Sequence, residues 1–207
     1  LLGKDWPKKF KYVETTLLSE EKCHLSFARE LTGYLQSMRD EVLPLESIKD
    51  RELGIVLSKQ NSSNTIREQN ESSLVQLLTL LDERLKSRIR FLVIDEDKEL
   101  YRKKIAEFKG YFSSKKCNKT IVQIYKEFLS AYGERHQIDV TNLIIQIDDH
   151  KFDLYDIAAL NIIKNRITRK KNDEEFGQIF IDEAQDFGGM VYYALRKTLP
   201  KCYFTIM

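Results

Sequence analysis

The chain has 207 residues, of which 42% are hydrophobic and 32% are charged. This length predicts one large domain or two small ones, with ample material for a core. Because 34 basic residues face 32 acidic ones, the net charge is only +2. Total charge therefore gives no indication of nucleic-acid binding, which only local clusters could indicate. Three prolines and eight glycines favour helices over a many-stranded sandwich.

Several classes of protein are excluded by simple patterns. The cysteines are odd in number and far apart, which excludes a disulfide framework and predicts reduced thiols in the cytoplasm: Cys23, Cys117 and Cys202. No apolar run approaches the roughly 20 residues of a membrane-spanning helix. Charged residues interrupt the first ten positions, so these do not resemble a secretory signal. We expect a cytoplasmic protein without a membrane segment.

The first half of the chain reads as helices separated by polar segments. Between residues 14 and 42, apolar residues recur at steps of three and four and predict one amphipathic helix: Ala28, Leu31, Leu35, Met38 and Val42. Residues 58–73 contain almost no apolar side chains and are expected to form a linker or mobile tip. Residues 74–92 carry the clearest amphipathic pattern of the sequence.

Further helices are expected in the second half. One covers residues 121–132 and should end near Gly133. Residues 142–147, NLIIQI, are either a strand or part of a helix. Asp153 is expected to cap a helix over residues 154–167. The final third then changes pattern: a buried strand at 178–182, a helix at 190–199 and a second buried strand at 202–207. This order predicts a parallel α/β unit.

Two stretches place Asp and Glu directly after an apolar run: FLVIDED at 91–97 and IFIDEAQDF at 179–187. A buried parallel strand brings the residues at its carboxyl end to the sheet edge where ligands bind. There an Asp can hold magnesium, directly or through water, and a neighbouring Glu can accept a proton from an attacking water. This pattern is typical of metal-assisted phosphate chemistry.

The second stretch is the better candidate. In the first, Phe91 and Leu92 continue the stripe of the preceding helix, so the acids are interpreted as a solvated, charged turn. The second stretch lies in the strand–helix–strand pattern. An alternative stays open, in which Asp182, Glu183 and Asp186 only cap the following helix.

The string IDEAQDF at 181–187 closely resembles the second conserved motif of superfamily-one helicases of the UvrD/Rep type. Two further stretches resemble the HelD-like branch of that family: YDIAALNIIKNRI at 155–167 and IVQIYKEFL at 121–129. The resemblance covers residues 120–207. It implies an α/β, predominantly helical fold, in which a helical insert accompanies part of a RecA-like parallel-sheet lobe of a P-loop NTPase.

By this resemblance, Asp182 is the magnesium-associated acid and Glu183 is the general base. Gln185, counted with the catalytic residues, and Asp186, counted with the nucleotide-binding ones, are expected to connect the nucleotide state to DNA-binding elements. The family's phosphate loop, G-x-x-x-x-G-K-[ST], does not occur in the sequence, and without it little would hold the phosphates. We therefore expect a piece of a larger motor that uses ATP and magnesium, with the phosphate loop before Leu1. Alone, the piece should bind neither and hydrolyse nothing.

Residues 98–126 form a basic stretch with nine Lys or Arg and two Glu, interleaved with aromatic rings. Its lysines could contact phosphates or an acidic partner, with these as candidates: Lys103, Lys104, Lys115 and Lys116. The alternative is a solvated helix face with the rings in the core, which the helical spacing of Tyr101, Ile105, Phe108 and Phe112 supports.

Two functions follow from the resemblance. In the first, residues 1–150 are the helical insert and 151–207 the distal part of the ATPase lobe of an ATP-dependent DNA helicase or translocase acting on single-stranded or forked DNA. In the second, the helices form a non-catalytic arm that docks on RNA polymerase, as the insert of HelD-like proteins does. The sequence does not choose between these partners.

Overall fold

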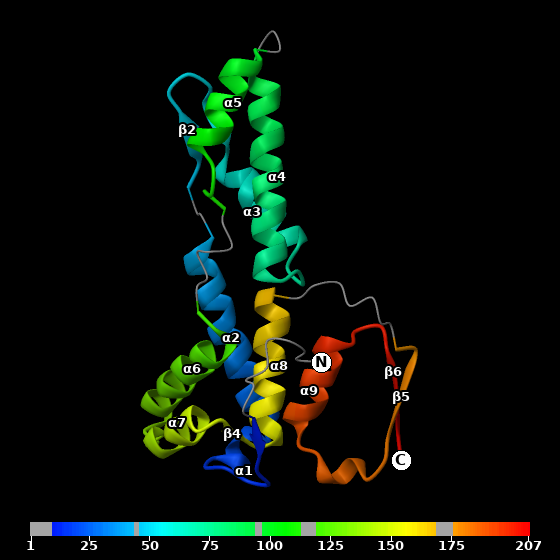
Figure 1. Ribbon diagram of the computed structural model, residues 1–207. Coiled ribbons are helices and arrows are strands. Elements are labelled where there is room, and N and C mark those ends of the chain that lie inside the picture. The colour runs from blue at the N-terminus through cyan, green and yellow to red at the C-terminus, as the bar shows by residue number, and fades with distance from the viewer. Residues whose placement is uncertain (1–9, 44–45, 94–96, 113–118, 169–175) are drawn as a thin grey trace. The chain divides into compact units, whose positions relative to one another are not determined.

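The computed structural model describes residues 10–43, 46–93, 97–112, 119–168 and 176–207. The fold is mostly helical, as expected, with small parallel and antiparallel sheets (Figure 1). The chain divides into two compact units: unit 1 is Leu1–Gln36 with Lys119–Met207, and unit 2 is Ser37–Asn118. These limits differ from the expected boundary near residue 150. Among the described residues, no helix has both the length and the apolar character needed to cross a bilayer.

Unit 1 is organised around one central helix. Its elements are β1 (Lys11–Tyr12), α1 (Ser19–Lys22), the first part of α2 (Leu25–Val42), α6 (Ile121–His136), α7 (Thr141–Asp148), β4 (Lys151–Phe152), α8 (Leu154–Thr168), β5 (Gln178–Ile181), the short 3-10 helix η4 (Ala184–Asp186), α9 (Gly189–Thr198) and β6 (Tyr203–Ile206). Helix α8 packs against α6 on one side and α9 on the other (Figure 1). Residues all around α8 are buried, as expected for a helix in the middle of a core.

Local capping explains where several helices begin. Asp153 caps α8 as predicted, because its Oδ1 accepts the amide of Asp156 at 2.8 Å. Asp156 returns the bond by accepting the amide of Asp153 at 3.0 Å, so the two acids form a reciprocal cap. Thr120 and Gln123 make the equivalent pair at the start of α6.

The predicted end of α6 at Gly133 is wrong, since the helix continues to His136 and ends at Gln137, which adopts φ 58°. Gly133 serves a different purpose: a Cβ there would lie 2.7 Å from the carbonyl oxygen of Ile138. The glycine therefore allows the chain after the helix to fold back against it. For NLIIQI, left open as strand or helix, the structure forms helix α7.

The predicted strand–helix–strand unit is present. Strands β5 and β6 pair in parallel in the register Gln178↔Tyr203 to Ile181↔Ile206, and α9 connects them. The prediction that both strands are buried is wrong for the described chain, since Phe180 and Tyr203 are 63% and 77% exposed. In the described part of the chain two strands pair in this sheet, whereas parallel sheets are normally larger and covered on both faces.

Unit 2 contains the hairpin of β2 (Ile48–Asp50) and β3 (Gly54–Leu57), with α3 (Lys59–Glu68), α4 (Leu74–Leu92) and α5 (Lys98–Glu107). The apolar stripe of α4 is buried as predicted. The linker or tip expected at 58–73 is instead mostly helix α3. Ser58 caps this helix, and Ser62 and Thr65 are buried, so polar side chains pack where the sequence indicated solvent.

Candidate functional site: an acidic turn after β5

The candidate site is the turn of residues 182–186, hereafter the acidic turn. It begins immediately after Ile181, the last residue of β5, and so lies at the carboxyl end of a parallel strand. Asp182, Glu183, Gln185 and Asp186 are all exposed, whereas Ala184 between them is buried. The turn thus presents its polar side chains to solvent and is attached to the fold through Ala184.

The backbone of the acidic turn is unusual at Glu183, whose φ is 50°. This left-handed conformation is uncommon for a residue with a side chain and costs free energy. The Oδ1 atom of Asp182 accepts the amide of Glu183 at 2.9 Å, and the side-chain amide of Gln185 donates to the carboxylate of Glu183. The four predicted site residues are therefore neighbours in one turn, and three of them interact directly.

The alternative that these acids cap the next helix is not supported. Helix α9 begins at Gly189, and its N-cap is Gly188, which provides no side-chain capping bond, rather than one of these acids. The first candidate stretch differs. Phe91 and Leu92 lie at the end of α4, and Asp97 caps α5 by accepting the amides of Glu99 and Leu100 at 3.0 Å. Residues 94–96 lie outside the described chain.

The acidic turn is compatible with magnesium bound through a nucleotide. No group of three or more His, Cys, Asp or Glu side chains in the described chain is arranged to hold a metal. Magnesium at phosphate sites commonly uses only one or two carboxylates and takes its other ligands from phosphate and water. The exposed carboxylate of Asp182, placed at the end of β5, is a donor of that kind.

Unit 1 also contains a buried charge cluster of Lys22, Asp153, Asp156 and Tyr125 (the buried cluster). The ammonium of Lys22 lies 2.8 Å from Asp153 and 2.6 Å from Asp156, and all three side chains are at most 1% exposed. The hydroxyl of Tyr125 donates to Asp156 at 2.6 Å. The cluster joins α1 and α6 to the first turn of α8.

Burial and charge act differently on the two carboxyls of the buried cluster. Burial raises the pKa of Asp156 despite the nearby Lys22. At Asp153 burial also raises the pKa, but the Lys22 charge and hydrogen bonds outweigh it, so the pKa is lowered. Burial likewise raises the pKa of Tyr125 well above its usual value. The pKa values of Asp153 and Asp156 shift in opposite directions because two carboxyl groups share a single ammonium.

Apart from the capping role of Asp153, no pattern in the sequence predicted the buried cluster. Lys22 and Asp156 are 134 positions apart, so no local pattern connects them. One signal existed: two Asp residues three positions apart at the start of a helix with no polar face. A buried pair of acids requires a buried cation.

The lysines proposed as partner contacts in the basic stretch differ in burial and in ion pairing. Lys104 is only 4% exposed and pairs with Asp50, Glu52 and Glu107 at 2.9, 2.8 and 3.1 Å. Hydrogen bonds to Glu52 and Asp50 raise its pKa. Because the ammonium of Lys104 is buried and paired with three carboxylates of the same unit, Lys104 is a poor candidate for contact with a partner. Lys103 stays 58% exposed, 3.8 Å from Glu52, and Lys115 and Lys116 lie outside the described residues.

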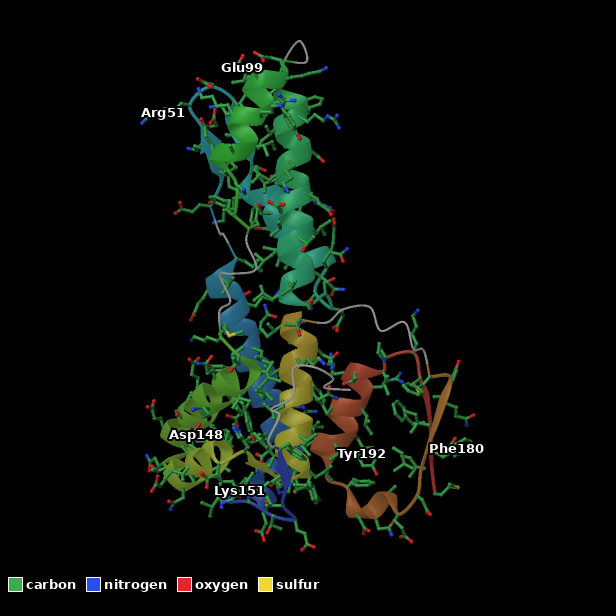
Figure 2. All side chains as sticks on the ribbon, in the orientation of Figure 1. Arg51, Glu99, Asp148, Lys151, Phe180 and Tyr192 are labelled. Atoms are coloured by element: carbon green, nitrogen blue, oxygen red, sulfur yellow. The ribbon has the colours of Figure 1, made fainter. Side chains whose placement is uncertain are left out.

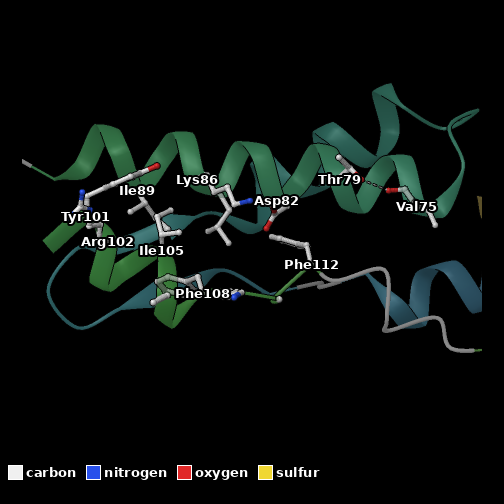
Figure 3. A pocket seen from close by; sticks show the side chains of 14 residues that line it. Val75, Thr79, Asp82, Lys86, Ile89, Tyr101, Arg102, Ile105, Phe108 and Phe112 are labelled. Atoms are coloured by element: carbon white, nitrogen blue, oxygen red, sulfur yellow. Dashed lines mark hydrogen bonds and ion pairs between the residues drawn. The ribbon is translucent and has the colours of Figure 1, made fainter. Parts of the chain in front are cut away.

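Unit 2 has a second feature of interest, a cleft between α4 and the segment of α5 through Phe112, with a volume of about 630 Å³. Apolar side chains line it, among them Leu85. Figure 3 shows four others: Ile89, Ile105, Phe108 and Phe112. Lys86, Arg102 and Lys109 also line it, against the single acid Asp82. The aromatic residues that the sequence placed on one helical face are thus brought together here, at a partly open, basic cleft.

Comparison of the chain with protein-family models, with curated proteins and with solved structures finds no match.

Proposed function

We propose that this chain contributes the distal part of the ATPase lobe, with a helical insert, to an ATP-dependent DNA helicase or translocase of superfamily one, HelD-like. The observation that carries the proposal is the acidic turn at the carboxyl end of β5 in the β5–α9–β6 unit. Polypeptide outside the printed sequence would supply the phosphate loop. Bound between the two parts, magnesium would neutralise phosphate charge.

The residues of the turn have distinct roles in this proposal. Asp182 holds the magnesium ion, directly or through a water. Glu183 accepts the proton of the attacking water, and the bond from Gln185 orients its carboxylate. Asp186 and Gln185 transmit the nucleotide state to the DNA-binding elements. The unusual backbone at Glu183 supports this assignment, because strained residues concentrate at functional sites.

The test measures ATP hydrolysis, with and without single-stranded DNA, in the natural protein that carries this sequence. Glu183→Gln should reduce turnover by at least about a hundredfold and leave ATP binding nearly unchanged, because a general base contributes that much to rate and little to binding. Glu134→Gln, at an exposed position on α6, is the matched control and should be inert. The 207-residue chain alone should not hydrolyse ATP. Full turnover by Glu183→Gln would refute the proposal.

A second candidate function is an interaction arm, and the cleft of unit 2 favours it. Its apolar and basic lining residues fit an acidic, amphipathic segment of a protein partner. For a HelD-like protein that partner would be RNA polymerase.

Pull-down with purified RNA polymerase separates the two candidates. If the chain is an interaction arm, the double variant Arg102→Glu, Lys109→Glu should weaken binding at least about tenfold, because it reverses the charge of two residues that line the cleft. Asp182→Asn and Glu183→Gln should leave binding to RNA polymerase unchanged. Arg51→Glu is the control, because Arg51 is exposed in the same unit but does not line the cleft (Figure 2). If the Arg102→Glu, Lys109→Glu variant binds RNA polymerase as tightly as the Arg51→Glu variant does, the cleft is not the docking site.

A further inference from the structure

One side chain outside the acidic turn reaches into its backbone. Tyr192, the fourth residue of α9 (Figure 2), donates its hydroxyl to the carbonyl of Ala184 at 2.5 Å. Ala184 is the buried residue between the exposed Glu183 and Gln185. Within the turn, the amides of Asp186 and Phe187 make 3-10 bonds to the carbonyls of Glu183 and Ala184 at 3.0 and 3.2 Å. The Tyr192 bond is thus an attachment of the turn to a stable helix.

The start of α9 is itself fixed. The amide of Met190 donates to the carbonyl of Cys23 at 3.0 Å, and a Cβ at Gly188 would lie 2.5 Å from the same oxygen. Glycine is needed here for this close approach. Lys22, the residue before Cys23, belongs to the buried cluster and connects α1 to α8. A continuous set of bonds therefore runs from α8 through α1 and α9 to the acidic turn.

We propose that Tyr192 is a positioning residue for the acidic turn, holding Ala184 so that Asp182 and Glu183 keep one orientation toward the nucleotide. This inference rests on the proposed function. Glu183 has a backbone conformation that is costly by itself, so an outside bond is needed to make it the resting state. The Tyr192 hydroxyl, at the adjacent carbonyl, supplies that bond, and the ring of Phe187 packs edge-on against the Tyr192 ring.

The chain offers a matched pair of variants for the test. Tyr192→Phe removes only the hydroxyl. Tyr193→Phe removes the hydroxyl of the next residue on the same helix, which bonds the Thr32 hydroxyl at 3.0 Å instead. In the natural protein, Tyr192→Phe should lower kcat for ATP hydrolysis by at least about tenfold with KM within about twofold, since small displacements of reacting groups cost that much. Tyr193→Phe should stay within about twofold of wild type on both.

A second readout uses the 207-residue chain and does not depend on catalysis. Amide hydrogen exchange at Asp186 and Phe187 should accelerate about tenfold in Tyr192→Phe, by loss of one hydrogen bond, and not in Tyr193→Phe. Unchanged kcat for Tyr192→Phe, in a preparation where Glu183→Gln is inactive, overturns the positioning role alone. If Glu183→Gln hydrolyses ATP normally, the proposed function fails. Exchange then still decides whether Tyr192 holds the turn, and unchanged exchange rates overturn that as well.

Discussion

The ammonium of Lys22 lies 2.6 Å from the carboxylate of Asp156, and neither side chain has measurable exposure to solvent. Two carboxylates and one ammonium share this interior, together with the hydroxyls of Tyr125, Ser19 and Thr16. Such a group is stable only while every member is paired, because an isolated buried charge is very unfavourable.

Lys22→Met should therefore destabilise unit 1 by about 3–5 kcal/mol, since it leaves buried acids without a cation. Urea unfolding of the 207-residue chain measures this. Lys86→Met is the control: Lys86 pairs with Asp82 at the same 2.6 Å distance, but its side chain is 52% exposed, so the loss should be below about 1 kcal/mol. Equal losses in the two variants would contradict the assignment of the buried cluster as a structural centre.

The stability of unit 2 should depend on pH through Asp50 and Lys104. Burial raises the pKa of Asp50, but bonds from Lys104 and from the amides of Leu53 and Glu52 outweigh it, so the folded pKa lies below 3.8. The stabilisation is present above the unfolded value and is lost as pH falls below it. The pKa of Lys104 is raised in the folded protein, which sets the alkaline limit. Its stabilisation is fully present below the unfolded pKa of 10.5 and is lost as the pH rises through the folded pKa.

Chemical unfolding between pH 5 and pH 2.5 measures the acid side of this dependence. Asp50→Asn should be less stable than wild type at pH 5 and should lose less stability on acidification. A wild-type curve that stays flat over this range would show that the Asp50–Lys104 pair contributes nothing.

Two helical glycines should respond oppositely to alanine. Gly133→Ala places a methyl group 2.7 Å from a backbone oxygen and should cost about 1–3 kcal/mol. Gly33→Ala, in α2, meets nothing within 4 Å and should stabilise the helix by about 0.5–1 kcal/mol. Thermal unfolding of both variants tests this. Stabilisation by Gly133→Ala would mean that the chain after α6 does not approach the helix as described.

Within the proposed function, Asp182 and Glu183 should be separable by their magnesium dependence. Asp182→Asn removes the charge that attracts the ion, so half-maximal hydrolysis should require about tenfold or more magnesium. Glu183→Gln should lower the rate without moving that midpoint. A titration of residual activity with magnesium distinguishes them, and an unchanged midpoint for Asp182→Asn would remove Asp182 from the metal site.

Sequence periodicity predicted those elements whose stability is local. The stripe of α4 follows from apolar spacing of three and four residues, the Asp153 cap from its residue type before such a stripe, and the strand–helix–strand order from short apolar runs on either side of a helix. The α4 stripe is confirmed because its side chains are buried on the face that the pattern defines, whereas β5 and β6 form in the predicted order without the predicted burial. The position of the acidic turn after Ile181 followed in the same way.

Elements that depend on distant residues escaped the sequence. Residues 59–68 look like a linker, yet they form α3, where Thr65 is buried and receives a hydrogen bond from Arg84 of α4. The β2–β3 hairpin was not predicted either, although its turn has a local signal: Asp50 accepts the amides of Glu52 and Leu53 at 2.8 Å. The contact of Tyr192 with Ala184 could not be anticipated either, since it requires α9 to fold back on the acidic turn.

The long sequence separation inside the buried cluster sets an order of events during synthesis. Lys22 leaves the ribosome 134 residues before Asp156, which at ordinary translation rates is an interval on the order of ten seconds. All of unit 2 emerges within that interval and is free to fold first. Until the start of α8 has been synthesised, Lys22 stays hydrated, because its partners Asp153 and Asp156 have not yet emerged.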